Sequence, residues 1–163
     1  RVGVDVMQVA LPHFEESSAS FCRTMSSSMS RSEREWVAQG ASEADVLSRL
    51  YDVWTYKEAL TKNMGLGLGY DFARIDLRFG RDVRLAMDGR AVDTYRFREL
   101  ALPCGASSRA PGSRVAIALG PRDAWEAPMS KQAVPAQQAM DEGWLRMWTY
   151  DAWLDYAWAM SGV

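Results

Sequence analysis

The sequence has few residues of the kinds that cross-link a chain or bind transition metals. Its 163 residues include two cysteines, Cys22 and Cys104, and one histidine, His13. Two cysteines are too few for the disulfide framework of a small secreted domain, so we expect free thiols and a cytoplasmic location. A single histidine in a loop has no second histidine with which to share a metal, so we expect His13 at the surface.

Long apolar runs and an excess of positive charge are also missing. No stretch approaches the roughly 18 apolar residues of a membrane helix, and the apolar start of the chain contains Asp5, which does not suit a signal peptide. A net charge of −2 argues against nucleic-acid binding, because nucleic-acid-binding domains are usually basic. The composition, 48% apolar and 25% charged, is typical of one globular domain with its own core.

The order of periodic patterns predicts an α+β fold, with helices packed on a small, mostly antiparallel sheet. Val2, Val4 and Val6 alternate with other residues as in a half-buried strand. Helices are expected at 21–29 and at 43–64, the second with Ser42 as N-cap. Between them, the capping box Ser30–Glu33 is expected to open another short helix. Further strands are expected at 73–79, 83–87, 94–100 and 115–119, with Asp88-Gly89 as the turn of a hairpin between 83–87 and 94–100. A run of helices followed by a run of strands is typical of α+β proteins.

We expect residues 1–120 to form the folded domain, and residues 121–163 to form a linker and a tryptophan-rich C-terminal extension. The segment 120–138 contains three prolines and is interpreted as the linker. Four of the seven tryptophans lie in 144–160. Gly65, Gly67 and Gly69 follow a helix C-terminus, where the dipole is negative, so a C-terminal cap and turn is favoured over a phosphate loop.

Lys57 interrupts the apolar face of the long helix, between Val53 and Leu60. A lysine that points into a core needs an anionic partner. Alternatively, it lies at the edge of the face and extends its ammonium to water, and the pattern leaves both possibilities open. Glu58 and Lys62 are one turn apart in the favourable orientation for an ion pair. Taken alone, such a pair is a surface feature that contributes about 0.3–0.5 kcal/mol.

Asp5 is the other polar residue in an apolar pattern, because it lies in the middle of a valine-rich strand. It is either an aspartate at a strand end that faces solvent or an arginine, or a ligand of a hard cation. Carboxylate oxygens suit Mg²⁺, which takes one or two of them and completes its shell with water and phosphate. Asp5 and Glu58 beside two lysines would make a metal and phosphate site, although periodicity does not show that they meet.

Two motifs in this order resemble those of 4'-phosphopantetheinyl transferases. Gly3-Val4-Asp5 matches the family's G-[IV]-D strand, and residues 54–62, WTYKEALTK, match W-[ST]-x-K-E-[AS]-x-x-K. The following residues 65–68, GLGL, and Asp71-Phe72 resemble the segment that leads members into their next strand. The resemblance covers residues 1–79 well and is looser up to Leu119.

The resemblance implies transfer of the phosphopantetheine arm of coenzyme A to a serine of an apo acyl or peptidyl carrier protein. It implies that Asp5 and Glu58 hold Mg²⁺, that Lys57 and Lys62 hold phosphate oxygens, and that Glu58 and Lys62 are catalytic. Glu58 is our candidate base for the serine proton. These are the groups that phosphoryl transfer needs, since it depends on positioning and on neutralising developing charge. In this interpretation a buried pyrophosphate is the anionic partner of Lys57.

The sequence departs from the family pattern in two ways. Many bacterial members have an acidic third metal ligand two residues after the aspartate, where this chain has Met7, and we expect water in that position. Larger members, including the animal and fungal cytosolic type that this chain resembles, are pseudo-dimers, and the chain matches their C-terminal half. It is therefore either a fragment or a self-assembling chain like the small trimeric holo-acyl-carrier-protein synthases.

The resemblance to animal and fungal members implies particular acceptors. These are the carrier domain of a fatty-acid or polyketide synthase, or the aminoadipate reductase of lysine biosynthesis, with no nucleic-acid or membrane partner. The first alternative is a non-catalytic module that binds coenzyme A or a carrier protein. The second is a structural domain in which Glu58 and Lys62 are surface charges. Glu33 is interpreted as a helix cap rather than a catalyst.

Overall fold

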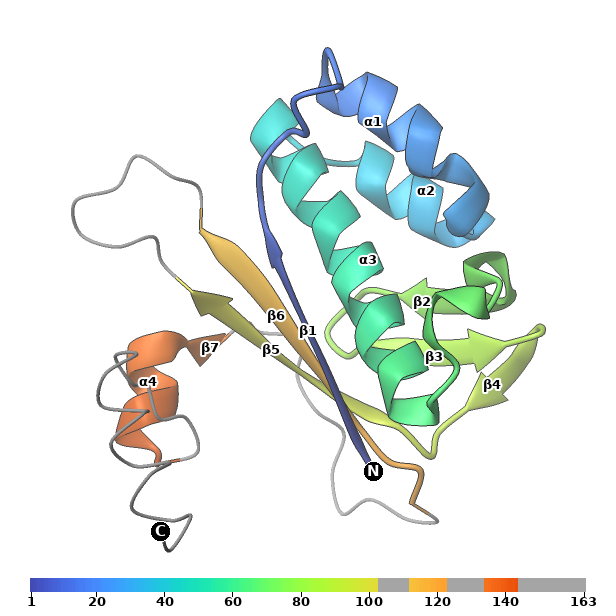
Figure 1. Ribbon diagram of the computed structural model, residues 1–163, viewed down its shortest axis with the longest axis vertical. Coiled ribbons are helices and arrows are strands. Elements are labelled where there is room, and N and C mark those ends of the chain that lie inside the picture. The colour runs from blue at the N-terminus through green and yellow to red at the C-terminus, as the bar shows by residue number, and fades with distance from the viewer. Residues whose placement is uncertain (103–111, 123–133, 144–163) are drawn as a thin grey trace, which may run out of the picture.

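The chain folds into four helices and two small sheets over the residues that the computed structural model describes, 1–102, 112–122 and 134–143 (Figure 1). The helices are α1 Ser18–Met25, α2 Arg31–Ala38, α3 Glu43–Met64 and α4 Ala136–Asp141, with 3₁₀ turns at Ser26–Ser28, Gly67–Gly69 and Phe72–Arg74. The strands are β1 Val2–Gln8, β2 Ile75–Arg78, β3 Arg84–Met87, β4 Arg90–Val92, β5 Arg96–Leu102, β6 Ser113–Leu119 and β7 Val134–Pro135. The predicted α+β class is confirmed. No helix in these ranges has the length and hydropathy that crossing a membrane requires.

The first sheet carries the residues that matter for function. Its strand order is β1-β6-β5-β7, with β6 antiparallel to both neighbours and β5 parallel to β7. In β1 the residues Gly3 and Asp5 are buried on one side of the strand, whereas Val2, Val4 and Val6 are exposed on the other. Helix α3 lies against this sheet in Figure 1. The alternation predicted for β1 therefore directs Asp5 towards the long helix.

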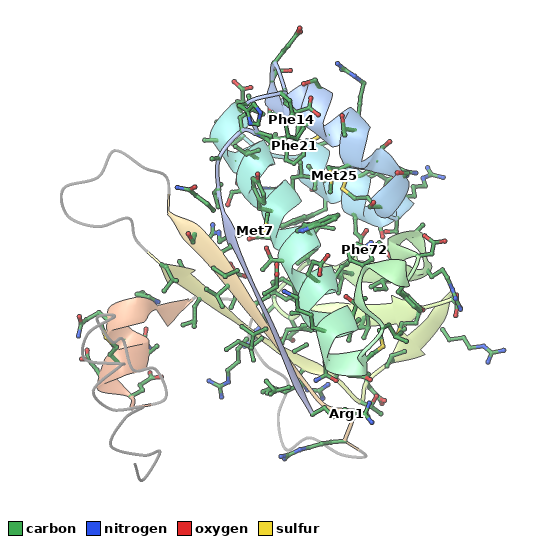
Figure 2. The ribbon with its side chains drawn as sticks, in the orientation of Figure 1. Arg1, Met7, Phe14, Phe21, Met25 and Phe72 are labelled. Carbon is green, nitrogen blue, oxygen red and sulfur yellow. The ribbon has the colours of Figure 1, made fainter. Side chains whose placement is uncertain are left out.

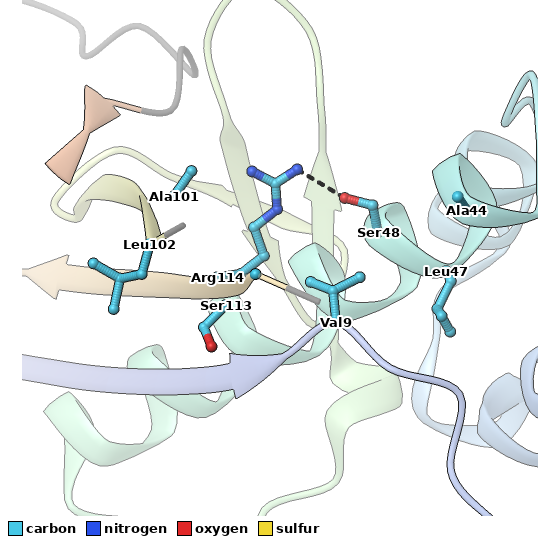
Figure 3. A pocket seen from close by; sticks show the side chains of 9 residues that line it. Val9, Ala44, Leu47, Ser48, Ala101, Leu102, Ser113 and Arg114 are labelled. Atoms are coloured by element: carbon cyan, nitrogen blue, oxygen red, sulfur yellow. Dashed lines mark hydrogen bonds between the residues drawn. The ribbon is translucent and has the colours of Figure 1, made fainter. Parts of the chain in front are cut away.

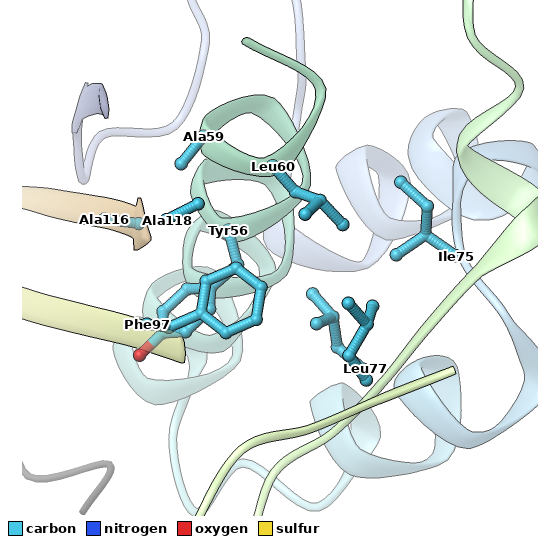
Figure 4. Close-up of a cluster of buried hydrophobic side chains, with 9 residues drawn as sticks. Tyr56, Ala59, Leu60, Ile75, Leu77, Phe97, Ala116 and Ala118 are labelled. Atoms are coloured by element: carbon cyan, nitrogen blue, oxygen red, sulfur yellow. The ribbon is translucent and has the colours of Figure 1, made fainter. Parts of the chain in front are cut away.

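Helix α3 begins and ends where the sequence predicts. The Ser42 side chain accepts a hydrogen bond from the Asp45 backbone N–H, and Gly65 ends the helix in the left-handed region, with φ of 75°. The C-terminal half packs Tyr56 and Leu60 into the main core, shown in Figure 4. Ala59 of the same helix also belongs to this core. Its remaining members come from the two sheets and are Ile75, Leu77, Leu85, Phe97, Ala116 and Ala118.

The predicted hairpin forms, but with a different second strand. The Asp88-Gly89 turn, with φ of 52° and 74°, joins β3 to β4, and these pair with β2 as the second sheet. The expectation that 94–100 completes this hairpin is wrong, because β5 pairs with β6 in the first sheet. Phe97 of β5 then stacks near Tyr56 of α3, which gives this strand an apolar surface to cover.

Two short helices cover the N-terminal half of α3. Helix α1 begins three residues earlier than the expected range 21–29, because Ser17 and Ser20 form a capping box. Its last expected turn is instead the 3₁₀ turn Ser26–Ser28. Helix α2 begins directly after its N-cap Ser30, and Ser30 and Glu33 form the predicted capping box. The two helices pack Phe21 and Val37 against Leu50 and Val53 of α3.

The segment expected to be a linker contains regular structure in its described part. Val134 of β7 pairs with Leu100 of β5, and α4 follows directly. Ala139 of α4 packs with Leu100 and Val115 on the face of the first sheet that bears the exposed valines. The stretch 134–138 thus contains β7 and the start of α4, and the division of the chain into 1–120 and a linker with a C-terminal extension remains a prediction. Cys104 and the four tryptophans of 144–160 lie outside the described residues.

Candidate functional site

Strand β1 and helix α3 bring Asp5 and Lys62 together. The Lys62 ammonium donates a hydrogen bond to Asp5 Oδ1 at 2.6 Å. Asp5 is 7% exposed, whereas the Lys62 side chain is 47% exposed. The lysine therefore reaches from solvent over a buried carboxylate, and its ammonium has two further hydrogens to offer a ligand.

Glu58 lies beside this pair, one helical turn before Lys62. Burial raises the pKa of its carboxyl, and the nearby charge of Asp5 raises it further, whereas Lys62 lowers it. Glu58 and Asp5 therefore lie close enough to repel each other. The structure thus brings Asp5 of β1 together with Glu58 and Lys62 of α3.

Only one of the two Asp5 carboxylate oxygens has a hydrogen-bond partner among the described residues. The other oxygen, Oδ2, is buried and has no such partner in the described part of the chain. A buried carboxylate oxygen without a partner is unfavourable, and a hard cation bridging Asp5 and Glu58 would remove both this penalty and the repulsion. Within the described ranges, no group of three or more His, Cys, Asp or Glu residues is placed to hold a metal. The donor set is thus two carboxylates, which fits a magnesium ion that keeps water and phosphate as its other ligands.

Lys57 does not join these residues. Its side chain is 1% exposed, so the alternative of an ammonium reaching water is wrong. The ammonium donates to Glu33 Oε2 at 2.6 Å and to the carbonyl oxygens of Ser28 and Phe72, both at 2.9 Å. All three ammonium hydrogens therefore have acceptors in the protein. The premise that Lys57 requires a pyrophosphate as its anion is also wrong, because Glu33 is that anion.

Glu33 is the residue whose importance the sequence does not reveal. It caps α2 as predicted, since Oε2 accepts from the Ser30 backbone N–H at 2.7 Å, and Oε1 accepts from the Leu77 N–H at 2.8 Å. Burial raises the pKa of the Glu33 carboxyl, although Lys57 and the two backbone N–H groups oppose the shift. Burial likewise lowers the pKa of Lys57 against the opposing effect of Glu33. The lysine in the apolar face is the sequence signal for a buried acid, but periodicity does not identify that acid.

An apolar groove of about 240 Å³ is lined by residues close in sequence to Asp5 and Glu58. Met7 follows Asp5 on the same side of β1, and Trp54 lies one turn before Glu58 on α3. Phe14, which is 69% exposed, forms part of the rim of the groove. Figure 2 shows Met7, Phe14, Phe21 and Met25 gathered between β1 and the α1 side of α3. The groove and Lys62 thus lie on opposite sides of Glu58 along the helix.

A second buried polar cluster lies towards the other end of α3. The Arg114 guanidinium donates to the Ser48 hydroxyl at 2.8 Å, as Figure 3 shows, and lies 3.4 Å from both Asp52 and Glu99. Tyr56 donates its hydroxyl hydrogen to Glu99 at 3.0 Å. A pocket of about 300 Å³ opens beside Arg114. Arg114 of β6 thus connects α3 with Glu99 of β5, and the sequence did not single out these groups.

The chain is similar to known proteins of one superfamily. Residues 1–117 match the model of the 4'-phosphopantetheinyl transferase superfamily. A curated relative is "4'-phosphopantetheinyl transferase pptA" of Paxillus involutus, 38% identical over 101 residues, which are 60% of this chain and 38% of the relative. A second, "Phosphopantetheinyl transferase" of a Thraustochytrium species, is 32% identical over 104 residues, or 60% of this chain and 36% of the relative.

More distant relatives have the same general name. "L-aminoadipate-semialdehyde dehydrogenase-phosphopantetheinyl transferase" of Homo sapiens is 26% identical over 109 residues, which are 61% of this chain and 35% of the relative. A solved structure titled apo-ACPS, from "Chronobacterium ammoiniagenes", is 18% identical with a TM-score of 0.46, over 72% of this chain and 94% of that one. The match spans less than two-fifths of each of these curated relatives. Because the family model covers well over half of its residues, this chain belongs to the 4'-phosphopantetheinyl transferase superfamily.

Proposed function

We propose that this chain supplies the magnesium- and pyrophosphate-binding wall of a 4'-phosphopantetheinyl transferase. The enzyme would move the phosphopantetheine arm of coenzyme A to a serine hydroxyl of an apo carrier protein. The observation that carries the proposal is the buried, unpartnered Oδ2 of Asp5 beside Glu58 and Lys62. Superfamily membership and the names of the curated relatives support the choice of reaction.

Asp5 and Glu58 would hold the magnesium ion. Two carboxylates from different elements, one of them with a free buried oxygen, are the donors that this ion prefers. When bound, magnesium would neutralise charge on the pyrophosphate. Lys62 would donate its remaining ammonium hydrogens to phosphate oxygens, since its side chain is half exposed at the mouth of the site. Lys57 is left out of this ligand set, because its three hydrogens are already donated within the protein.

The transfer forms one bond and breaks another at a single phosphorus. The serine oxygen attacks the phosphorus that bears the pantetheine arm, and the bond from that phosphorus to the 3',5'-ADP leaving group breaks. Glu58 is the candidate base that takes the serine proton. Lys62 stabilises negative charge on the phosphate oxygens.

We also place the carrier protein on the groove side of Glu58. If Lys62 holds the phosphates, the opposite side of Glu58 along α3 is the side from which the serine arrives. That side presents the apolar residues Met7, Phe14 and Trp54, which line the groove. An apolar side chain near the acceptor serine would fill this groove, which would orient the hydroxyl.

The acceptor is proposed from the relatives. The names of the human and rat proteins refer to L-aminoadipate-semialdehyde dehydrogenase. We therefore propose the carrier domain of an aminoadipate reductase as one acceptor. The family resemblance adds the carrier domain of a fatty-acid or polyketide synthase as an alternative acceptor.

The test combines binding with transfer. Calorimetry measures magnesium binding to the chain, and coenzyme A binding with and without magnesium. Mass spectrometry then measures whether each apo carrier domain gains one phosphopantetheinyl group. Gain of the group by one carrier supports the proposal. Magnesium-dependent binding without transfer would favour the non-catalytic binding module, and the absence of both would contradict the proposed site.

A further inference from the structure

Gly3, the glycine of the G-[IV]-D motif, lies where β1 crosses α3 at very short range. A Cβ atom on Gly3 would be 2.1 Å from the carbonyl oxygen of Ala59 and 2.4 Å from the backbone nitrogen of Asn63. Ordinary van der Waals contact begins at 3.4 Å, so the strand and the helix would have to separate by roughly 1 Å. Both atoms belong to the helix backbone, and no rotation of a side chain can relieve the clash. Any residue larger than glycine would therefore push β1 and α3 apart.

The crossing is built from small residues and one anchoring amide. Ala59 of α3 faces Ala116 and Ala118 of β6, as Figure 4 shows, and all three are fully buried. The Asn63 side-chain amide donates to the Ala118 carbonyl at 3.0 Å. Gly3 pairs with Ala118 in the sheet register. The helix is thus held against two adjacent strands without a large side chain between them.

Both proposed magnesium ligands lie next to this crossing. Asp5 is two residues beyond Gly3 on the same side of β1, and Glu58 directly precedes Ala59, whose carbonyl Gly3 contacts. The distance between β1 and α3 at Gly3 therefore sets the distance between the two carboxylates. Magnesium tolerates little error here, because it requires oxygen ligands at about 2.0–2.1 Å in near-ideal octahedral geometry.

We propose that Gly3 is a positioning residue for magnesium: it allows the close crossing that brings Asp5 and Glu58 within reach of one ion. This inference rests on the proposed function, since it takes the two carboxylates as the metal ligands. It assigns a role to the motif glycine that is separate from any contact with substrate. A separation of about 1 Å exceeds the roughly 0.5 Å within which a binding site must be held.

The test is calorimetric titration of magnesium into the chain and its variants. Gly3→Ala should weaken magnesium binding at least about tenfold, the lower range for disturbing the support of a metal ligand. Gly69→Ala is the matched control, because a Cβ there meets no atom within 4 Å, and it should bind magnesium as the unmodified chain does. Leu85→Ala is the control for stability, since Leu85 is buried in the second sheet. It should lower the denaturation midpoint without changing magnesium affinity.

The outcomes separate a positioning role of Gly3 from a purely structural one. Unchanged magnesium affinity in Gly3→Ala would overturn the inference, even if that variant is less stable. If Gly3→Ala does not fold, Asn63→Ala replaces it, because it loosens the same crossing without a clash. Asn63→Ala should also weaken magnesium binding, and unchanged affinity there would overturn the inference equally. If the unmodified chain binds no magnesium, the proposed function itself fails.

Discussion

Lys57 and Glu33 form an ion pair that is closed to solvent on both sides. Nζ and Oε2 are 2.6 Å apart, with side-chain exposures of 1% and 0%. The remaining hydrogen bonds of the pair go to the backbone of Ser28, Ser30, Phe72 and Leu77. The pair therefore fixes α2 and the start of β2 to the middle of α3, and it directs Lys57 away from the face that presents Glu58.

Breaking this pair should destabilise the chain strongly. Lys57→Met leaves the Glu33 carboxylate buried without a cation, which typically costs about 3–5 kcal/mol. The double variant Glu33→Gln/Lys57→Met should lose less than the sum of the two single variants, by about 0.5–3 kcal/mol, because the residues are directly coupled. Urea unfolding of the four proteins measures this coupling.

An exposed ion pair in the same region is the control for the Lys57 prediction. Arg31 and Glu35 of α2 pair at 2.8 Å but are largely exposed, so Arg31→Met should change stability by less than about 1 kcal/mol. Two results together would instead identify Lys57 as a phosphate ligand. The effects of the Glu33 and Lys57 changes on stability would be additive, and Lys57→Met would lose coenzyme A binding while keeping the stability of the unmodified chain.

Asp5→Asn should separate metal binding from folding. Asparagine keeps the size of the side chain but removes its charge, so magnesium binding should fall below detection. Stability without magnesium should stay the same or increase, because the repulsion between the Asp5 and Glu58 carboxylates is removed. Calorimetry with magnesium and thermal denaturation without it measure the two effects. A large loss of stability would mean that Asp5 is structural.

Much of this site could be predicted from the sequence, because its parts are local. The valine alternation places Asp5 on the inner side of β1, and Ser42 and Gly65 define α3, so the helix carries Glu58 and Lys62 in the predicted register. Spacing along one element determines such features. The resemblance then supplied the reason to place these elements together, which periodicity cannot do.

The features of the fold and the site that the sequence did not predict depend on contacts between elements distant in sequence. Alternation predicts that 94–100 is a strand but not which sheet it joins, and that choice follows from packing of Phe97 on Tyr56. Lys57 requires an acid, yet its partner is 24 residues away. Gly3 offered a usable signal, since glycine inside a strand often marks a close backbone approach. Its partner, the Ala59 carbonyl, is visible in the folded chain.

The raised pKa of Glu58 predicts opposite pH dependences for folding and for metal binding. The folded-state pKa lies above the ordinary value of 4.5, chiefly through burial. The stabilising contribution of protonated Glu58 is therefore complete below pH 4.5 and is lost as the pH rises through the folded-state pKa. Magnesium competes with that proton, so its affinity should rise over the same window. Glu58→Gln should abolish the stability change, and an unchanged stability profile in this variant would contradict the assignment.

Lys62→Met should weaken coenzyme A binding. Because the Lys62 side chain is 47% exposed, this change should cost less stability than the roughly 3–5 kcal/mol expected for the fully buried Lys57–Glu33 pair. A lost charge-assisted hydrogen bond to phosphate corresponds to about 1.5–3 kcal/mol, or roughly 10- to 150-fold in affinity. Lys62→Arg keeps the charge and should retain most of the binding. Equal affinity in the methionine variant would place the phosphates elsewhere.

Phe14→Ser should impair use of the carrier protein but not of coenzyme A. Phe14 is 69% exposed on the rim of the groove, so its removal leaves the fold and the carboxylates in place. Loss of one apolar contact of about 1–3 kcal/mol should raise KM for the carrier by roughly 5- to 150-fold. Coenzyme A affinity with magnesium should remain unchanged, because the phosphates are held beside Lys62 on the other side of Glu58. Val4→Ser, on the opposite face of β1, is the matched control and should leave both constants unaltered. If Phe14→Ser alters coenzyme A affinity instead, the groove accommodates the pantetheine arm rather than the acceptor.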